Sequence, residues 1–168
     1  MELALFVILA VIAVIAAAGV VVSKKAATSA LFLLLNFCTL AGLYILLNAQ
    51  FIAAAQVIIY AGAIVVLFLF VVMLLSPGKE EGQDRKPYAK ISAVFLAVLM
   101  LVEVGYVLVT GVLGGMSGEY TPEKIAEVGN VQAIGQVLFT DFLLPFELAS
   151  VLLLVGIVGA VVLAKKEL

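Results

Sequence analysis

The sequence predicts an all-α integral membrane protein with five transmembrane helices, and three observations lead to this prediction. Of the 168 residues, 66% are hydrophobic and only 12% are charged, whereas a soluble domain has about 45–50% apolar and about 25% charged residues. Five runs each reach the roughly 20 apolar residues that a helix needs to cross a bilayer. These runs lack the alternation expected of barrel strands, and a helix satisfies its own backbone hydrogen bonds in lipid.

The five predicted spans begin with a retained helix. This first run starts MEL without a basic residue, is longer than the roughly 7–15 residues of a signal-peptide core, and is followed by two lysines, so it is not expected to be a secretory signal peptide. The three-residue turn "NAQ" predicts that the second and third spans pack as an antiparallel hairpin. The spans are residues 3–22, 28–47, 53–75, 91–113 and 142–163.

Two longer connections complete a chain that we expect to form a single domain, residues 1–168. The loop at 76–90 opens with Pro-Gly, which stops the third span, and its mixed charges favour water. The connection at 114–141 contains Thr121-Pro122, which is typical of a helix start with Thr as the cap. Further on, apolar residues at helical spacing predict a short helix on the outer membrane surface; they are Val131, Ile134, Val137 and Leu138.

Basic residues are distributed unequally between the two sides of the membrane that five spans define. The connections after the first, third and fifth spans share one side and hold eight of the nine Lys and Arg residues, whereas the other side holds Lys124 alone. Because cytoplasmic loops are enriched in Lys and Arg, we predict a cytoplasmic C-terminus and an outside, periplasmic N-terminus. The eight are Lys24, Lys25, Lys79, Arg85, Lys86, Lys90, Lys165 and Lys166.

The composition also argues against several kinds of function. The chain has no histidine and a single cysteine, Cys38, while iron–sulfur, haem and zinc sites draw on several such ligands. We therefore expect no catalytic, cofactor-binding or metal-binding residues in this chain, and one cysteine cannot form an intrachain disulfide. A net charge of −2 without basic clusters predicts no nucleic-acid partner.

Polar residues in the third span are the first candidates for function. Gln56 and Tyr60 are spaced i, i+4 and are expected to share a face with Ala53 and Ala63. Small residues permit close helix contact in lipid, and amide or hydroxyl groups hydrogen-bond across such an interface. Gly62 weakens the helix locally. Beside a tyrosine that can bond a freed carbonyl, it is compatible with a one-residue π-bulge.

Two carboxylates in predicted spans are the remaining candidates. Glu103 lies near the middle of the fourth span, with Tyr106 and Thr110 on the same helical face. A charge at this depth costs at least ~2.5 kcal/mol, so it marks either a proton relay or a protonated carboxyl that fixes helix packing. Glu147 follows Pro145 near the start of the last span. There it serves as a relay or as an interfacial acid that the helix dipole stabilises.

The segment "AQVIIYAGAIVVLFLFVVML" and its surroundings resemble a known family. Together with the preceding hairpin, it is similar to the signature region of the J subunits of bacterial proton-translocating NADH:quinone oxidoreductase, respiratory complex I, and of their mitochondrial counterpart, NADH dehydrogenase subunit 6. "FELASVLLLVGIVGAVVLA" resembles the last helix of the family. The fourth span and both long loops are less diagnostic.

The resemblance implies a membrane-arm subunit in the cell inner (plasma) membrane that crosses the lipid bilayer several times. FMN, iron–sulfur clusters and quinone would be bound by partner subunits. The partners would be subunits K, A and H and the antiporter-like subunits. The third helix of the family carries a π-bulge that Tyr60 and Gly62 match, and the bulge is thought to open or close a hydrated proton link. This role would make the third span a conformational hinge.

The match differs among the other candidates, and two further functions remain open. Glu147 matches an acid of the last-helix motif, Gln56 replaces a carboxylate found in some relatives, and Glu103 matches no family pattern. A small secondary transporter, or a subunit of a multisubunit cation/proton antiporter, is the first alternative, although such a transporter usually shows inverted repeats. A purely structural membrane spacer is the second.

Overall fold

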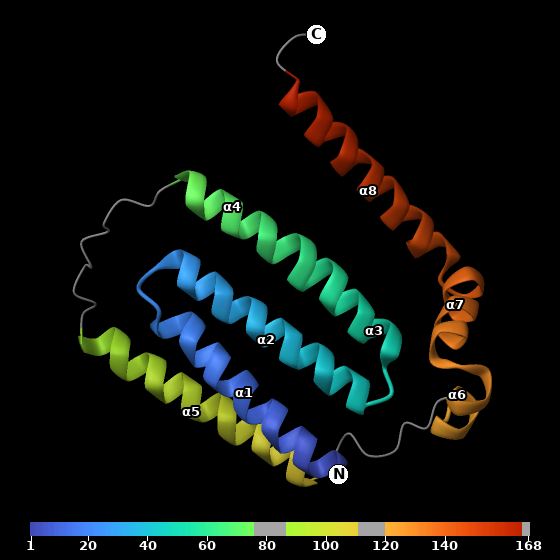
Figure 1. Ribbon diagram of the computed structural model, residues 1–168. Helices are drawn as coiled ribbons and strands as arrows, with labels where there is room; N and C mark the ends of the chain where they lie inside the picture. Colours follow the sequence, from blue (N-terminus) through green and yellow to red (C-terminus); the bar gives the residue numbers. More distant parts are fainter. Residues whose placement is uncertain (76–86, 111–119, 166–168) are drawn as a thin grey trace.

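The computed structural model describes residues 1–75, 87–110 and 120–165, and every regular element in these ranges is helical (Figure 1). The third helix of the chain is continuous from Gln50 to Leu75 but contains a π-helical segment, η1. The elements are α1 (Glu2–Val22), α2 (Ala26–Leu46), α3 (Gln50–Ala55), η1 (Gln56–Ile64), α4 (Val65–Leu75), α5 (Pro87–Thr110), α6 (Pro122–Val128), α7 (Asn130–Thr140) and α8 (Leu143–Ala164).

Four helices are long and apolar enough to cross a membrane: α1, α2, the continuous helix Gln50–Leu75, and α8. They match the first, second, third and fifth predicted spans to within a few residues. The fourth predicted span falls on α5, in which the described side chains give a shorter apolar stretch, Ser92–Val107. Residues 111–113, which would extend it, lie outside the described residues, so five spans remain a prediction.

The helices α1, α2 and α3–η1–α4 lie side by side as one antiparallel layer (Figure 1). Buried apolar residues in this layer are nearly all alanines, which let the helix backbones approach closely. Polar side chains bridge α1 and α2: Asn36 Nδ2 donates to the Ala13 carbonyl at 2.8 Å, and Ser29 Oγ donates to the Val20 carbonyl at 2.6 Å. These bonds satisfy polar groups that lipid would leave unpaired.

The turn between α2 and α3 has the length that the sequence predicts. Asn48 adopts a left-handed conformation, with φ 58°, which asparagine tolerates better than most residues. The Ala49 N–H donates to the Tyr44 carbonyl at 2.9 Å and closes the end of α2. The prediction of an antiparallel hairpin here is confirmed.

Two short helices, α6 and α7, follow in the connection before α8. The predicted helix start is confirmed: Thr121 is the N-cap of α6, its hydroxyl oxygen accepts from the Lys124 N–H at 3.4 Å, and proline occupies the first turn. The second predicted helix is α7, in which Ala133 is buried. Its position on the membrane surface remains a prediction.

The pH dependence of α6 follows from Glu123. Hydrogen bonds from its own backbone N–H and from the Thr121 hydroxyl lower the pKa of this carboxyl. Because the pKa is lower in the folded state, the ionised carboxylate stabilises the helix at pH values above the unfolded-state pKa. This stabilisation is lost as the pH falls through the folded-state pKa. We therefore expect Thr121→Val to raise the pKa of Glu123 toward its ordinary value. Titration of that carboxyl by NMR in a peptide spanning α6 and α7 checks this, and an unchanged pKa would contradict it.

The remaining two long helices have few neighbours within the described residues. The helix α5 packs against none of the other described helices, and α8 contacts only α7. No side chain of α8 is buried. Such extended apolar surfaces indicate that lipid or other polypeptides cover them.

Candidate functional site

The candidate site is the π-helical segment η1 in the third helix. At its end the Val65 N–H donates to the Tyr60 carbonyl, five residues back and not four. The flanking residues Ala55 and Val65 keep right-handed helical angles, so the helix continues through the segment without a break. π-Helical turns, which contain one extra residue per turn, are rare in proteins. Those that do occur are often found at functional sites. This segment contains Gln56, Tyr60 and Gly62.

The extra residue changes which side chains face the α2 helix. The buried residues are Ala53, Gln56, Ala61 and Val65, so the step from 56 to 61 is five residues long. Of the four residues on the predicted face, Ala53 and Gln56 are buried within this chain, whereas Tyr60 is 46% exposed and Ala63 is also exposed. Beyond Gln56 the π-helix turns the following residues away from the direction that an α-helix would give them.

Gly62 has a geometric reason to be glycine in this conformation. A Cβ atom added at this position would lie 3.2 Å from the Val57 carbonyl oxygen, five residues back in the same helix. This is closer than ordinary van der Waals contact, and the neighbour is a backbone atom. A side chain at this position therefore requires the Val57 carbonyl to shift by a few tenths of an ångström in the π-helical form.

Tyr60 contacts the neighbouring helix through its ring. The ring centroids of Tyr60 and Phe37 are 5.5 Å apart in an edge-to-face arrangement, with an interplanar angle of 69°. Such pairs contribute about 0.5–1.5 kcal/mol beyond their buried area. The tyrosine is therefore held by α2 through its ring, while almost half of its surface stays accessible.

Tyr60→Phe is expected to change the coupled quinone-reductase turnover that the sequence resemblance implies only modestly, by less than about twofold, because the aromatic contact that holds the ring is kept. Tyr60→Ala removes the contact as well and is expected to lower turnover more. Quinone-reductase and proton-translocation rates of membranes that carry the two variants check this. An equal, large loss in both variants would contradict this and assign the main role to the hydroxyl, which both substitutions remove.

Gln56 is one of two buried polar side chains in the described part of the chain, and Thr39 on α2 is the other. The Thr39 hydroxyl donates to the Asn36 carbonyl at 2.7 Å, which keeps that proton within its own helix. Gln56 is therefore a buried polar group in η1, the segment that packs against α2.

The two carboxylates that the sequence singles out do not join this site. Glu103 is exposed on α5, where Thr110 Oγ1 donates to the Tyr106 carbonyl at 2.8 Å. Glu147 is exposed in the second turn of α8. Within residues 1–75, 87–110 and 120–165, no three His, Cys, Asp or Glu side chains gather in a way that could hold a metal ion.

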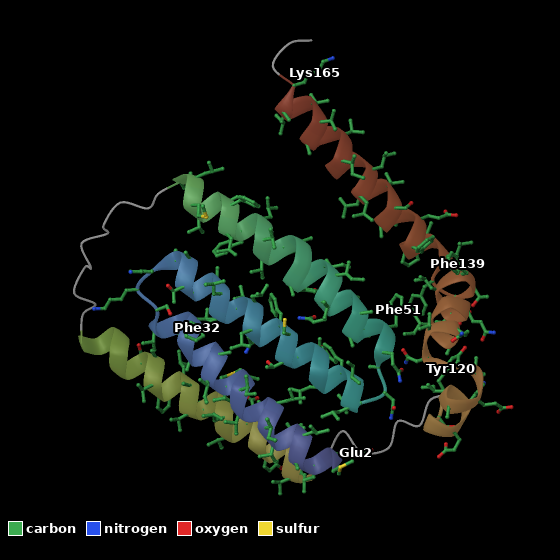
Figure 2. All side chains as sticks on the ribbon, in the orientation of Figure 1. Glu2, Phe32, Phe51, Tyr120, Phe139 and Lys165 are labelled. Atoms are coloured by element: carbon green, nitrogen blue, oxygen red, sulfur yellow. The ribbon has the colours of Figure 1, made fainter. Side chains whose placement is uncertain are left out.

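Sequence reasoning missed Asn130, the first residue of α7. Its Oδ1 accepts a hydrogen bond from the Phe51 backbone N–H at 3.1 Å, although 79 positions separate the two residues. Figure 2 labels Phe51 at the start of α3, next to α7. One signal was available in the sequence: the helix that begins at Gln50 has Ala49 as its N-cap, which offers no side-chain acceptor.

Comparison with known proteins relates the chain to subunits of oxidoreductase complexes. A family model described as NADH-ubiquinone/plastoquinone oxidoreductase chain 6 matches residues 16–163. NAD(P)H-quinone oxidoreductase chain 6 of Nostoc sp. is 45% identical over 96% of this chain and 78% of its own length. F(420)H(2) dehydrogenase subunit J of Methanosarcina mazei is 40% identical over 99% of this chain and 93% of its own. NADH-quinone oxidoreductase subunit J of Rickettsia bellii is 32% identical over 92% and 76%.

These matches cover the π-helical segment, its neighbours and the last helix, and they confirm the resemblance that the sequence suggests. The chain belongs to the NADH-ubiquinone/plastoquinone oxidoreductase chain 6 family, which corresponds to subunit J in NADH-quinone oxidoreductases.

Proposed function

We propose that this chain helps couple quinone reduction to proton translocation through a conformational change in the helix α3–η1–α4. It acts as a membrane-arm subunit of a proton-translocating NADH:quinone oxidoreductase. The observation that carries the proposal is the π-helical segment Gln56–Ile64 within an otherwise α-helical span of a member of this family. A segment with two helical forms of similar energy is a natural element for a switch.

The change would act by rotation. One residue corresponds to about 100° of rotation in an α-helix, so removing the extra residue of η1 turns one flank of the helix relative to the other. Residues near Gly62 then exchange places between the α2 interface and the surface that faces partner subunits or lipid. Such an exchange moves the polar groups of Gln56 and Tyr60 and opens or closes a hydrated link for protons. Both residues, with Gly62 as the hinge, are the site that we propose.

The electrons would travel elsewhere in the complex. In this proposal the chain has no catalytic site of its own, and FMN, iron–sulfur clusters and quinone are held by partner subunits. The names of the relatives support this division. They specify NAD(P)H, F(420)H(2) or NADH as the electron donor, yet all three proteins are similar in sequence to this chain over most of its length. A subunit that is common to complexes with different electron donors is expected to serve the quinone and proton side.

The placement in the membrane follows from the same proposal. The whole chain, residues 1–168, forms one integral domain in the cell inner (plasma) membrane, with α5 as a fifth crossing and the C-terminus in the cytoplasm. Subunits K, A, H and the antiporter-like subunits then cover the exposed apolar faces of α5 and α8. Glu103 and Glu147, which lie on these two helices, contact partner subunits there as proton-path or packing residues.

Gentle solubilisation of the membrane and purification through a tag on this chain tests the proposal. The expected product is a very large assembly with flavin and iron–sulfur signals and with NADH:quinone reductase activity. Recovery of the chain as a small oligomer without these signals would contradict the proposal and favour an independent transporter. Normal turnover and pumping in every η1 variant, within a correctly assembled complex, would instead favour a structural spacer.

A further inference from the structure

The contact between α7 and α3 is the one place, within the described residues, where the segment α6–α8 packs against the layer of α1 to α4. The hydrogen bond from the Phe51 N–H to Asn130 Oδ1 lies in this contact. Phe51 is the second residue of the helix that enters η1 five positions later. A contact at this position acts on the start of the switchable helix.

We propose that Asn130 is a positioning residue that caps the N-terminus of α3 from another helix and thereby sets the helical form of η1. This inference rests on the proposed function, because it assigns a control point to the same helix. It concerns a residue outside η1 and a contact that no motif of the third helix reveals.

The start of α3 needs an acceptor that its own sequence does not supply. The first four N–H groups of an α-helix have no partner within the helix, and a Ser, Thr, Asp or Asn side chain at the N-cap usually accepts from one of them. Here the N-cap residue is Ala49, and no local side chain caps the helix. Asn130 provides the amide oxygen that a local N-cap would otherwise provide.

Asn130 is itself held in place by the junction between α6 and α7. Gly129 has φ +94°, a conformation that residues with side chains rarely adopt, and its N–H donates to the Ile125 carbonyl at 2.9 Å. A Cβ atom at this position would also overlap the side-chain amide of Gln132. The first residue of α7 therefore has a fixed direction relative to α6.

A cleft of about 720 Å³ lies beside the contact, between the α2–α3 turn and the α6–α7 junction, and Asn130 lines it. Water that enters this cleft competes for the Phe51 N–H, so the bond can break without unfolding either helix. A single bond that can break in this way can change the position of the neighbouring helix. The contacts between α1 and α2, in contrast, are extensive and hold those two helices together.

Two fixed points therefore enclose the π-helical segment. Asn130 holds the helix at Phe51, before the segment, and Val65, which is fully buried, holds it directly after. With both points fixed, the extra residue of η1 has to stay between them. Loss of the Asn130 contact frees the first point, and the helix can then rotate its first turns and return toward α-helical spacing.

The test compares Asn130→Leu, which keeps the size of the side chain but removes the acceptor, with Asn130→Asp, which keeps an acceptor. Gln136→Leu is the matched control, because it makes the same amide-to-aliphatic change at an exposed position on the same helix. Each variant is studied in the intact purified complex by hydrogen–deuterium exchange of peptides covering residues 50–56. Proton translocation per quinone reduced is measured in parallel.

We expect Asn130→Leu to accelerate exchange of this peptide by roughly fivefold, the factor that corresponds to loss of one helix cap, and to lower protons translocated per quinone reduced. Asn130→Asp and Gln136→Leu are expected to match the unsubstituted complex in both measurements. A merely structural role for Asn130 would lower the yield of the complex and leave the ratio unchanged.

Two outcomes would overturn the inference. The first is exchange in Asn130→Leu equal to that in Gln136→Leu. The second is faster exchange with an unchanged proton-to-quinone ratio while Gly62→Val still impairs coupling, a result that leaves the proposed function intact. Failure of the proposed function gives a different result: Gly62→Val would then leave coupling normal. In that case η1 is not a switch, and Asn130 has no switch to control.

Discussion

Gly62→Val lowers coupled NADH:quinone turnover and proton translocation by roughly tenfold if η1 has to keep or regain its π-helical form during turnover. The reason is the Val57 carbonyl oxygen, which lies 3.2 Å from the position of an added Cβ atom. Overpacking of this kind costs typically about 1–3 kcal/mol, which corresponds to factors from about five to more than a hundred. Rates in membrane vesicles, normalised to the amount of assembled complex, measure the effect.

The comparison needs a graded series and a matched glycine. Gly62→Ala adds only the Cβ atom and is expected to give an intermediate loss, because the carbonyl has to move by a few tenths of an ångström. Gly156→Ala is the control: it lies in a regular α-helix, and nothing in the described residues lies within 4 Å of its added Cβ atom. If Gly62→Val left proton pumping and quinone turnover at the levels of the unsubstituted complex, the proposal that Gly62 is a hinge would be wrong.

The sequence predicts most of the helices because they depend on local composition. The apolar runs, the short turn at Asn48 and the cap at Thr121 each contain their own signal within a few residues, and the structure places helices accordingly. The predicted start of the third helix, residue 53, lies after the observed one, since α3 begins at Gln50, where the helix uses an acceptor from Asn130. No local pattern encodes a partner that is 79 positions away.

The sequence singles out residues of the π-helical segment, but not the geometry of that segment. Gln56, Tyr60 and Gly62 do lie in the π-helical segment, yet the buried face follows Ala61 and not Tyr60. An expected face assumes one helical period along the whole helix, and a single extra residue shifts every later position. The surroundings of Glu103 and Glu147 could not be derived either, because the helices that carry them have few neighbours within the described residues.

Gly19→Val is expected to give the second large effect, through assembly and not through coupling. A Cβ atom at Gly19 on α1 would lie 2.6 Å from both Cγ and Cδ1 of Phe32 on α2, where Figure 2 labels this phenylalanine. The Cγ atom is bonded directly to Cβ, so the ring cannot move aside without changing its rotamer. The close contact of α1 and α2 is then lost, and we expect several-fold less assembled complex on native gels.

A double variant separates this steric effect from any other consequence of losing glycine. Phe32→Ala empties the space that the valine needs, so Gly19→Val/Phe32→Ala is expected to recover part of the assembled complex, although Phe32→Ala alone lowers it by leaving a cavity. Gly105→Val serves as the control, since nothing in the described residues lies within 4 Å of a Cβ atom there. Equal losses in Gly19→Val and the double variant would contradict a direct clash. The turnover per assembled complex should stay normal in all of these variants. The reason is that α1 and Tyr60 contact different faces of α2, so complexes that do assemble keep η1 in its normal position.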